Sequence, residues 1–241
     1  MRVTSLNIEH GCVFTVLMGD YESLNEQPMA AVSGLDFICL TDNPLLRSNT
    51  WDVRLVTPMF EMDQVRSQRY VKLRPHEFLP DHDCSLYIDN SVLLSKDPAD
   101  ELRSKLASHD LALFLHSFRE SVEAEFAEVA LLKFDCRRTL AEQLQHYRNA
   151  VPHVLRERPY WSGMLFRRHA SPAAIAFSAI WTAHVLRYSR RDQLSLNYAL
   201  AKSGLQPNAI EEDNHSSTLH SWPHARNRRL EVSIVGNEGE T

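Results

Sequence analysis

One carboxylate stands where a short apolar run ends, and a strand at this place would carry it to the edge of a sheet. The run is CSLYI (84–88), and Asp89, Asn90 and Ser91 follow it. An apolar run of strand length closed by an acidic residue predicts a buried strand. Open α/β folds bind ligands at the carboxyl ends of such strands. We therefore expect metal-assisted chemistry at Asp89.

Cationic side chains precede that strand. Arg66, Arg69 and Lys72 lie three residues apart in a stretch with a helical pattern, so they share one broad side of a helix. Guanidinium and ammonium groups bind phosphate, and the row predicts a phosphate-binding face near Asp89. The alternatives are a solvated charged surface for the row and a simple turn-forming role for Asp89.

These residues need a scaffold, and apolar segments alternate with helical segments along the chain. We expect strands at residues 12–18, 36–40, 51–56, 86–88, 92–94, 111–115 and 163–166. We expect helices at residues 62–73, 97–108, 122–132, 138–149, 172–186 and 192–202. Nearly continuous apolar strands between helices predict an α/β sandwich around a mostly parallel sheet. Asp97 is the expected N-cap of the second helix, and Gly204 is the expected end of the last.

The periodic pattern is lost after residue 206. We therefore divide the chain into a catalytic domain, residues 1–207, and a C-terminal segment, residues 208–241. This segment is either a lid over the active site or a disordered tail.

Composition narrows the class of protein. The 241 residues, 44% of them hydrophobic, can bury one large core, and a net charge of −5 gives no field that attracts nucleic acid. The cysteines Cys12, Cys39, Cys84 and Cys136 are far apart, and three lie in apolar runs, so we expect buried thiols in a reducing compartment. The apolar run before Asp20 is too short for a signal peptide or a membrane span, which predicts a cytoplasmic protein with no transmembrane segment.

The small number of glycines argues against two enzyme classes. The chain has only seven, with no Gly-x-Ser-x-Gly element and no phosphate-cradling glycine loop. This argues against a serine hydrolase and a P-loop enzyme.

Five motifs follow one another along the chain. They are DFICLTD (36–42), RxxRxxKLxPHxxLP (66–80), YID (87–89), HxxR (116–119) and RDQLS (191–195). In this order they resemble a glycosyltransferase-like family, long catalogued as a domain of unknown function, of bacterial polysaccharide loci and plant Golgi proteins linked to mucilage and pectin synthesis. The resemblance covers about residues 12–205, and its specific parts are KLxPH and RDQLS.

The resemblance implies a GT-A fold that binds a nucleotide sugar. Asp89 would hold a divalent cation, Mn²⁺ or Mg²⁺, against the donor diphosphate, and Arg69 or Lys72 would contact phosphate. Cations stabilise the negative charge that builds on the leaving diphosphate. The usual Asp-x-Asp of such folds has Ser91 at its third position here, so the cation site lacks one carboxylate.

The resemblance also implies roles for further residues. Such enzymes often take another metal ligand from a C-terminal histidine, for which the candidates are His215, His220 and His224. The metal ligands are then Asp89 and His220. The catalytic candidates are Asp192, Gln193 and Glu125. The candidates for donor binding are Tyr21, Asp42, Arg66, Arg69, Lys72, Asn90, Ser91, His116 and Arg119.

Several of these residues have competing structural explanations. An acid at a helix start, such as Asp192, complements the helix dipole with or without a substrate. Glu125 could cap a helix, and Arg119 could be a surface residue.

Three functions follow from these observations. The first is a glycosyltransferase that moves a hexosyl or related sugar from a nucleotide sugar to a glycan, lipid-linked or small-molecule acceptor. The second is a metal-dependent amidase, because one plant relative has been described as an alkaline ceramidase. The third is a non-catalytic protein that binds sugar or nucleotide on a degenerate transferase fold, which is consistent with the missing carboxylate.

Overall fold

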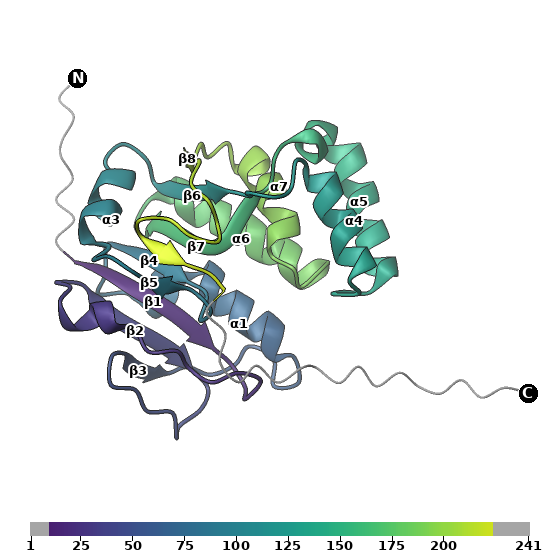
Figure 1. The fold of residues 1–241 in the computed structure, drawn as a ribbon. Helices are drawn as coiled ribbons and strands as arrows, with labels where there is room; N and C mark the ends of the chain where they lie inside the picture. Colours follow the sequence, from purple (N-terminus) through teal and green to yellow (C-terminus); the bar gives the residue numbers. More distant parts are fainter. Residues whose placement is uncertain (1–9, 224–241) are drawn as a thin grey trace, which may run out of the picture.

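The computed structural model of the chain describes residues 10–223 and is built around one seven-stranded sheet (Figure 1). The strands are β1 (Gly11–Leu17), β2 (Asp36–Thr41), β3 (Asp52–Leu55), β4 (Cys84–Ile88), β6 (Leu111–Leu115), β7 (Tyr160–Arg168) and β8 (Asn208–Ile210). Their order across the sheet is β3-β2-β1-β4-β7-β6-β8. Of the seven, only β7 runs antiparallel to its neighbours. The other six therefore end at the same edge.

Helices cover both faces of this sheet. They are α1 (Gln64–Leu73), α2 (Pro75–Phe78), α3 (Ala99–Lys105), α4 (Val122–Leu131), α5 (Arg137–Ala150), α6 (Pro172–Arg187) and α7 (Gln193–Ser203), with short 3₁₀ turns at Pro28–Ala31 and Pro152–Arg156. A small second sheet pairs β5 (Leu93–Leu94) with β9 (His220–Ser221). The predicted α/β sandwich with a mostly parallel sheet is thereby confirmed.

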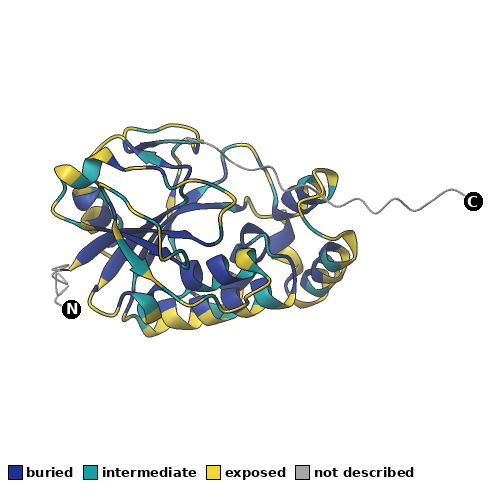
Figure 2. Ribbon diagram, turned by 90° about the horizontal axis from the view of Figure 1, so that it is seen from below, coloured by how far each residue is buried: buried dark blue, intermediate teal, exposed yellow. Residues whose placement is uncertain are grey.

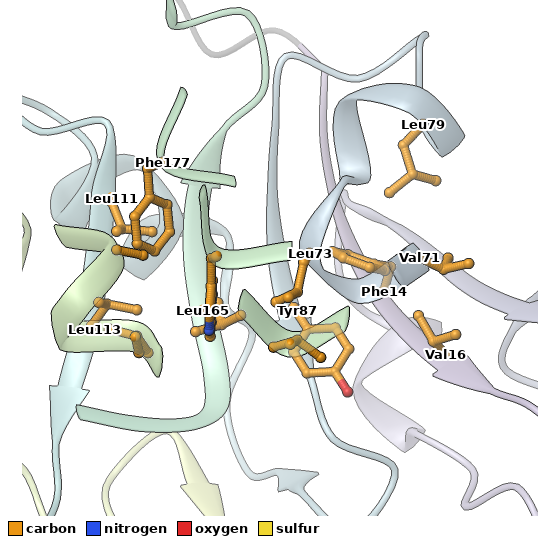
Figure 3. Close-up of a cluster of buried hydrophobic side chains, with 14 of the residues drawn as sticks. Phe14, Val16, Val71, Leu73, Leu79, Tyr87, Leu111, Leu113, Leu165 and Phe177 are labelled. Carbon is orange, nitrogen blue, oxygen red and sulfur yellow. The ribbon is translucent and has the colours of Figure 1, made fainter. Parts of the chain in front are cut away.

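The central strands are buried on both sides (Figure 2). In β1, Phe14 and Val16 pack into a first core with α1, α6 and α7, which Figure 3 shows, whereas Val13 and Leu17 pack into a second core with α3. Alternate side chains of a strand point to opposite faces, so a strand between two cores is apolar throughout. Each large apolar side chain buried in this way contributes roughly 1.5–3 kcal/mol. The α1, α6 and α7 helices are thus anchored against the sheet.

A third apolar cluster joins α4 and α5 to α7. It contains Phe126 of α4, Tyr147 of α5 and Tyr198 of α7, and the Tyr147 and Tyr198 rings stack with 4.3 Å between their centres. The pair of helices lies at the end of the molecule away from β3 (Figure 1). The start of α7 therefore lies between the first core and this cluster.

Local signals set several helix ends as predicted. Asp192 is the N-cap of α7, and Gly204 ends it with a φ of 70° that favours glycine. The prediction for α3 needs a correction, because Pro98 is its N-cap and the helix ends at Lys105 rather than at residue 108. Asp97 still accepts a hydrogen bond from the Ala99 N–H, at 3.1 Å. The chain turns after Lys105 because Leu106 is buried in the second core before β6 begins.

Two predictions about the C-terminal half need correction. The strand predicted at 163–166 is present but longer, from Tyr160 to Arg168. Residues after 206 are not irregular throughout, because β8 pairs with β6 in the central sheet and β9 pairs with β5. Strands of two or three residues are too short to show a period in the sequence. The functional division at residue 207 stays a prediction, and residues 224–241, including His224, lie outside the described residues.

Two further predictions concern the cysteines and membrane spans. Cys12, Cys39 and Cys84 are buried and Cys136 is exposed, and all four are free thiols. No helix within residues 10–223 has the length and apolar composition needed to cross a membrane.

His169 predicts acid sensitivity of the fold. Its Nε2 lies 2.8 Å from the Ser85 Oγ, and burial, followed by the charge of Arg167, lowers the pKa of His169 to about 3. The unfolded chain, with a histidine pKa of about 6.5, binds this proton more tightly. The free energy of unfolding should therefore fall as the pH drops from about 6.5 to 4, by about 3 kcal/mol from this residue.

Urea unfolding at pH 7 and pH 4.5 checks this prediction. His169→Gln can still bond Ser85 but cannot titrate, so it should flatten the decline in stability. The partly exposed His109→Gln is the matched control and should keep the wild-type decline. An equal decline in both variants would contradict the assignment to His169.

Candidate functional site

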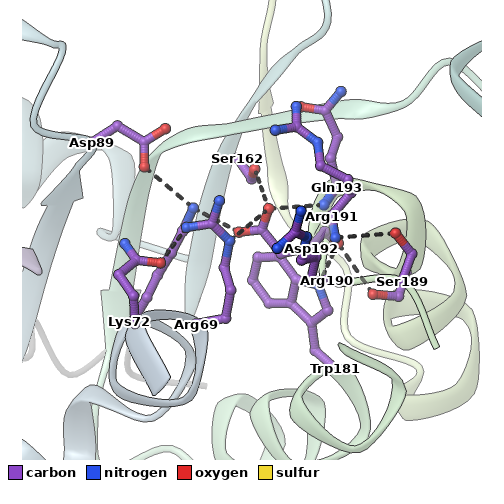
Figure 4. A network of polar contacts seen from close by, with 12 residues as sticks. Arg69, Lys72, Asp89, Ser162, Trp181, Ser189, Arg190, Arg191, Asp192 and Gln193 are labelled. Atoms are coloured by element: carbon purple, nitrogen blue, oxygen red, sulfur yellow. Dashed lines mark hydrogen bonds and ion pairs between the residues drawn. The ribbon is translucent and has the colours of Figure 1, made fainter. Parts of the chain in front are cut away.

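Charged side chains gather at the edge of the sheet where β4 ends and β7 begins (Figure 4). Arg69 and Lys72 come from α1, Asp89 follows β4, and Asp192 begins α7. Ser162 of β7 completes the contacts around Asp192. Because β7 is antiparallel to β4, its beginning lies beside the end of β4, which places Ser162 at this edge. We call Arg69, Lys72, Asp89, Asp192 and, as described below, Arg191 the charged cluster.

Lys72 lies between the two carboxylates of this cluster. Its Nζ is 2.6 Å from Asp192 Oδ2 and 3.5 Å from Asp89 Oδ1. It also lies 4.6 Å from the centre of the Tyr87 ring, and the lysine side chain is completely buried. An ammonium group can be buried at acceptable cost only when opposite charges pair with it. Asp192 and Asp89 provide that pairing.

Asp192 is held from several sides. Its Oδ1 accepts hydrogen bonds from Ser162 Oγ at 3.2 Å and from the Gln193 N–H at 3.1 Å, and it lies 3.4 Å from Arg69 Nε. Burial alone would raise the pKa of Asp192, but Arg69 and then Lys72 outweigh it and hold this pKa well below its usual value. The carboxylate is therefore ionised and is a weak base.

Two buried side chains hold the helices that carry the cluster. The Trp181 indole donates to the Asp192 carbonyl at 2.8 Å, which fixes the start of α7. Arg167 of β7 donates to the carbonyls of Lys72 at 3.2 Å and Leu73 at 2.7 Å. These are among the last carbonyls of α1, which have no partner within the helix. The positions of both helices thus depend on contacts with α6 and β7.

Asp89 is the exposed member of the cluster. One third of its side chain is accessible, and Tyr87 Oη donates to its Oδ1 at 2.6 Å. Burial and then Asp89 raise the pKa of Tyr87, so this phenol stays a donor. Gln68 in turn donates to Tyr87 Oη at 3.1 Å. Within residues 10–223, nothing donates a hydrogen bond to Oδ2 of Asp89, which leaves this oxygen for a ligand.

Arg191 adds a third cation. Its guanidinium lies 4.9 Å from the centre of the Phe134 ring, and its buried Nε has no hydrogen-bond partner in the described part of the chain. Burial, followed by the charge of Arg69, lowers the pKa of Arg191. Within the charged cluster three cations thus face two carboxylates, and Glu125 is a further acid beside Arg191. A bound anion would relieve the excess positive charge.

The oxygen donors beside Asp89 do not fit a divalent cation. Asn90 uses both ends of its amide to hold residues 23–25, at 2.8 and 2.9 Å. Ser91 Oγ accepts a hydrogen bond from the Trp222 indole at 3.1 Å. The described residues contain no group of three or more His, Cys, Asp or Glu side chains arranged to hold a metal ion. Mg²⁺ and Mn²⁺ prefer several oxygen ligands. Here one carboxylate oxygen, Oδ2 of Asp89, is left to bind such an ion.

His220 makes two hydrogen bonds of its own. Its Nε2 lies 3.1 Å from the carbonyl oxygen of Asn214, which can only accept, and its Nδ1 lies 2.9 Å from Ser217 Oγ. The buried ring also stacks on Trp161, with 5.6 Å between ring centres. A metal ion could bind this ring only after one of the two bonds was broken. The metal prediction for His220 stays a prediction.

A second polar group lies where β6 ends. Glu125 is buried and pairs with Arg119 at 3.0 Å, and burial raises its pKa, partly offset by Arg191 and Arg119. Burial, and next the charge of Arg119, lower the pKa of His116 to about 4, so this buried imidazole is neutral at pH 7. A neutral imidazole and a carboxylate of raised pKa can both accept a proton.

A shallow hollow of about 230 Å³ lies at the ends of β1 and β2. Its walls are Gly19, Asp20, Asp42, Asn43 and Gln64. Asp42 Oδ1 accepts a hydrogen bond from the Gly19 N–H at 2.9 Å, which joins the two loops. Gly19 has a φ of 70°, which favours glycine, and a Cβ there would lie 2.2 Å from the end of the Gln64 side chain, which would have to move. Tyr21 beside these loops is 38% exposed and donates to Glu22. A second hollow, about 240 Å³, lies at the opposite edge of the sheet.

The structure does not bring Arg66 into the charged cluster. Its guanidinium donates to the carbonyls of Tyr188 at 2.8 Å and Val185 at 3.3 Å, at the end of α6, and pairs with Asp63. A step of three residues rotates the side chain by about −60°, so two steps separate Arg66 from Lys72 by about 120°. This separation follows from the six-residue spacing between Arg66 and Lys72, so the prediction of one shared side was wrong for Arg66.

Sequence reasoning missed three residues of the site, namely Tyr87, Ser162 and Arg191. Tyr87 and Arg191 stood inside the motifs YID and RDQLS, beside the acids that were selected. Ser162 carried no signal, because its role depends on β7 running antiparallel to β4.

Comparisons with known proteins bear on the family and the fold. Residues 40–215 match the family model described as TOD1/MUCI70, glycosyltransferase-like domain. The chain is 28% identical over 168 residues to the Arabidopsis thaliana protein named "Probable hexosyltransferase MUCI70", which covers 66% of this chain. The match spans only 29% of that relative. The fold is similar to that of the WbbM bifunctional glycosyltransferase in its apo structure, with a TM-score of 0.52 and 11% identity, over 84% of this chain and 38% of that one.

The two acids of the cluster should differ in their effect on stability. Asp192→Asn leaves Lys72 and Arg69 buried without their main counterion, so it should lower the free energy of unfolding by about 3–5 kcal/mol. Asp89→Asn keeps an acceptor for Tyr87 at a partly exposed position and should cost about 1 kcal/mol or less. Urea unfolding at pH 7 measures both, and equal losses would contradict the central place of Asp192.

Proposed function

The chain belongs to the TOD1/MUCI70 glycosyltransferase-like family, and from this premise we propose that it transfers a sugar from a nucleotide-sugar donor to an acceptor hydroxyl. The observation that carries the proposal is the excess positive charge of the charged cluster. Arg69, Lys72 and Arg191 converge at the carboxyl edge of the sheet, where α/β folds bind ligands. A donor diphosphate carries negative charge, which would balance the excess positive charge of this cluster.

The strand order supports an arrangement of the two substrates. The hollow beside Asp42 lies at β1 and β2, the charged cluster at β4 and β7, and the group with His116 and Glu125 at β6. We assign the nucleoside to the first position, with Tyr21 beside it, the diphosphate to the second and the acceptor to the third. The sugar would then lie between donor phosphate and acceptor.

The charged cluster suits the chemistry of the donor side. When the bond between sugar and diphosphate breaks, negative charge grows on the leaving phosphate. Arg69 and Lys72 are already fixed by Asp192, so they need no rearrangement to stabilise this charge. Asp192 acts here as a positioning residue. Gln193, buried beside it, contributes its backbone N–H to the same arrangement.

The acceptor side needs a group that takes a proton from the attacking hydroxyl. Asp192 is a poor base, because its pKa is held well below the usual value. Burial raises the pKa of Glu125, which makes it a stronger base than an exposed carboxylate, and Arg119 fixes its orientation. We assign the role of base to Glu125, with the neutral His116 as its neighbour.

The donor sugar, acceptor and location complete the proposal. A hexosyl donor follows the name of the A. thaliana relative, and the acceptor is a glycan, a lipid-linked sugar or a small molecule. Unpaired buried thiols at Cys12, Cys39 and Cys84 support a cytoplasmic location.

Removal of one cation tests the proposal. A panel of nucleotide sugars is first screened with the wild-type protein for release of nucleoside diphosphate, in the presence of candidate acceptors. With the best donor, Arg69→Ala should lower kcat/KM roughly 10- to 100-fold, because a hydrogen bond to a charged group contributes about 1.5–3 kcal/mol. Lys96→Ala is the control, since this lysine is half exposed and, among residues 10–223, forms an ion pair with Glu101 alone. Turnover of Arg69→Ala at the wild-type rate would contradict the assignment.

A further inference from the structure

Lys72 places its ammonium group between Asp89 and Asp192, where a metal ion that bridges two carboxylates would otherwise lie. We propose that the Lys72 ammonium is the resident cation of this site and that a diphosphate binds here without a metal ion. The inference rests on the proposed transferase function for the choice of ligand. It departs from the divalent cation that the sequence motifs imply.

The contacts of Lys72 leave no place for a second cation between the same acids. Its Nζ lies 2.6 Å from Asp192 and 3.5 Å from Asp89, and the Tyr87 ring covers a further side at 4.6 Å. A divalent ion would contact carboxylate oxygens at about 2.0–2.6 Å and would compete for this space. The ammonium is attached to α1 and cannot leave. Its side chain is completely buried, so its charge would act on a diphosphate at this edge without direct contact.

The charge of the cluster points the same way. Lys72, Arg69 and Arg191 face Asp89 and Asp192, and Glu125 offsets part of the charge of Arg191. A divalent cation at the free oxygen of Asp89 would add two positive charges beside Lys72 and Arg69 in a partly buried site. Like charges at such short range repel strongly where water is scarce. A diphosphate instead brings negative charge to these cations.

The chain also provides the means to hold Lys72 in place. Arg167 binds the carbonyl of Lys72 itself at 3.2 Å, so the backbone that carries the ammonium is fixed to β7. Asp192 is fixed by Ser162 and Trp181. The cation and its counterion are thus held by separate buried contacts, as a permanent site requires.

Inorganic pyrophosphate tests the inference, because it contains the diphosphate and no sugar or base. Calorimetry in EDTA should show that the wild-type protein binds pyrophosphate. Mn²⁺ binding is followed by electron paramagnetic resonance with the protein alone, because pyrophosphate itself complexes Mn²⁺. The wild-type protein should show no stoichiometric Mn²⁺ site.

Lys72→Met keeps the shape of the side chain and removes its charge. In EDTA this variant should bind pyrophosphate roughly 10- to 100-fold more weakly. With the space between Asp89 and Asp192 vacated by the ammonium, the variant should gain a Mn²⁺ site that the wild type lacks. Lys96→Ala, the half-exposed control, should match the wild type in both measurements.

Three results would overturn the inference. These are a stoichiometric Mn²⁺ site in the wild type, pyrophosphate binding that EDTA abolishes, and no pyrophosphate binding under either condition. If Lys72→Met does not fold, the two wild-type measurements decide alone. If the wild type binds pyrophosphate only with a metal ion, this inference is wrong but the proposed transferase function is not contradicted. If the wild type binds pyrophosphate without metal but transfers sugar from no donor, this inference holds and the proposed transferase function is wrong.

Discussion

The pairing of Asp192 with Lys72 is the interaction on which the site depends. Both side chains are removed from water, and neither could be buried as an ion without the other. Their separation by 120 residues means that α1 and α7 must be placed accurately before the pair can form. Arg69 strengthens the arrangement from the same helix as Lys72. The geometry of the charged cluster is therefore a consequence of how two helices pack on one sheet.

The single reversed strand makes this packing possible. Because β7 runs against β4, its first residues lie beside Asp89, and Ser162 reaches Asp192 from the sheet. Farther along the same strand, Arg167 binds the last carbonyls of α1. One strand thus supports both partners of the buried pair, and the first core fixes α1, α6 and α7 against it.

The charged cluster is the reason that we propose an anionic donor at this edge of the sheet. Carboxylates alone would attract cations, and cations alone would be costly to bury. Here the carboxylates Asp89 and Asp192 hold the cations in place, and the cations remain in excess. Such a site is organised before its ligand arrives, which is the condition under which charged groups stabilise a transition state most. The family to which the chain belongs is consistent with this chemistry.

The sequence by itself determined those features that depend on near neighbours in the chain. Alternation of apolar strands and helices predicted the α/β sandwich, the acid after an apolar run placed Asp89 at the edge of the sheet, and Gly204 marked the end of α7. These signals arise from side-chain periodicity and backbone conformation, which act over a few residues. The motifs also predicted Arg69, Lys72 and Asp192 as site residues.

Only the tertiary structure decided which charges meet. The row of cations in α1 separates, so that Arg66 binds the end of α6 while Lys72 lies between two acids. Arg191 enters the cluster, and Asn90 and Ser91 hold neighbouring segments instead of facing a cation. Ion pairs and hydrogen bonds between distant residues depend on the rotation of helices and the direction of strands. The spacing of residue types does not encode how a helix is rotated against its neighbours or which way a strand runs. The packing of the two cores sets both.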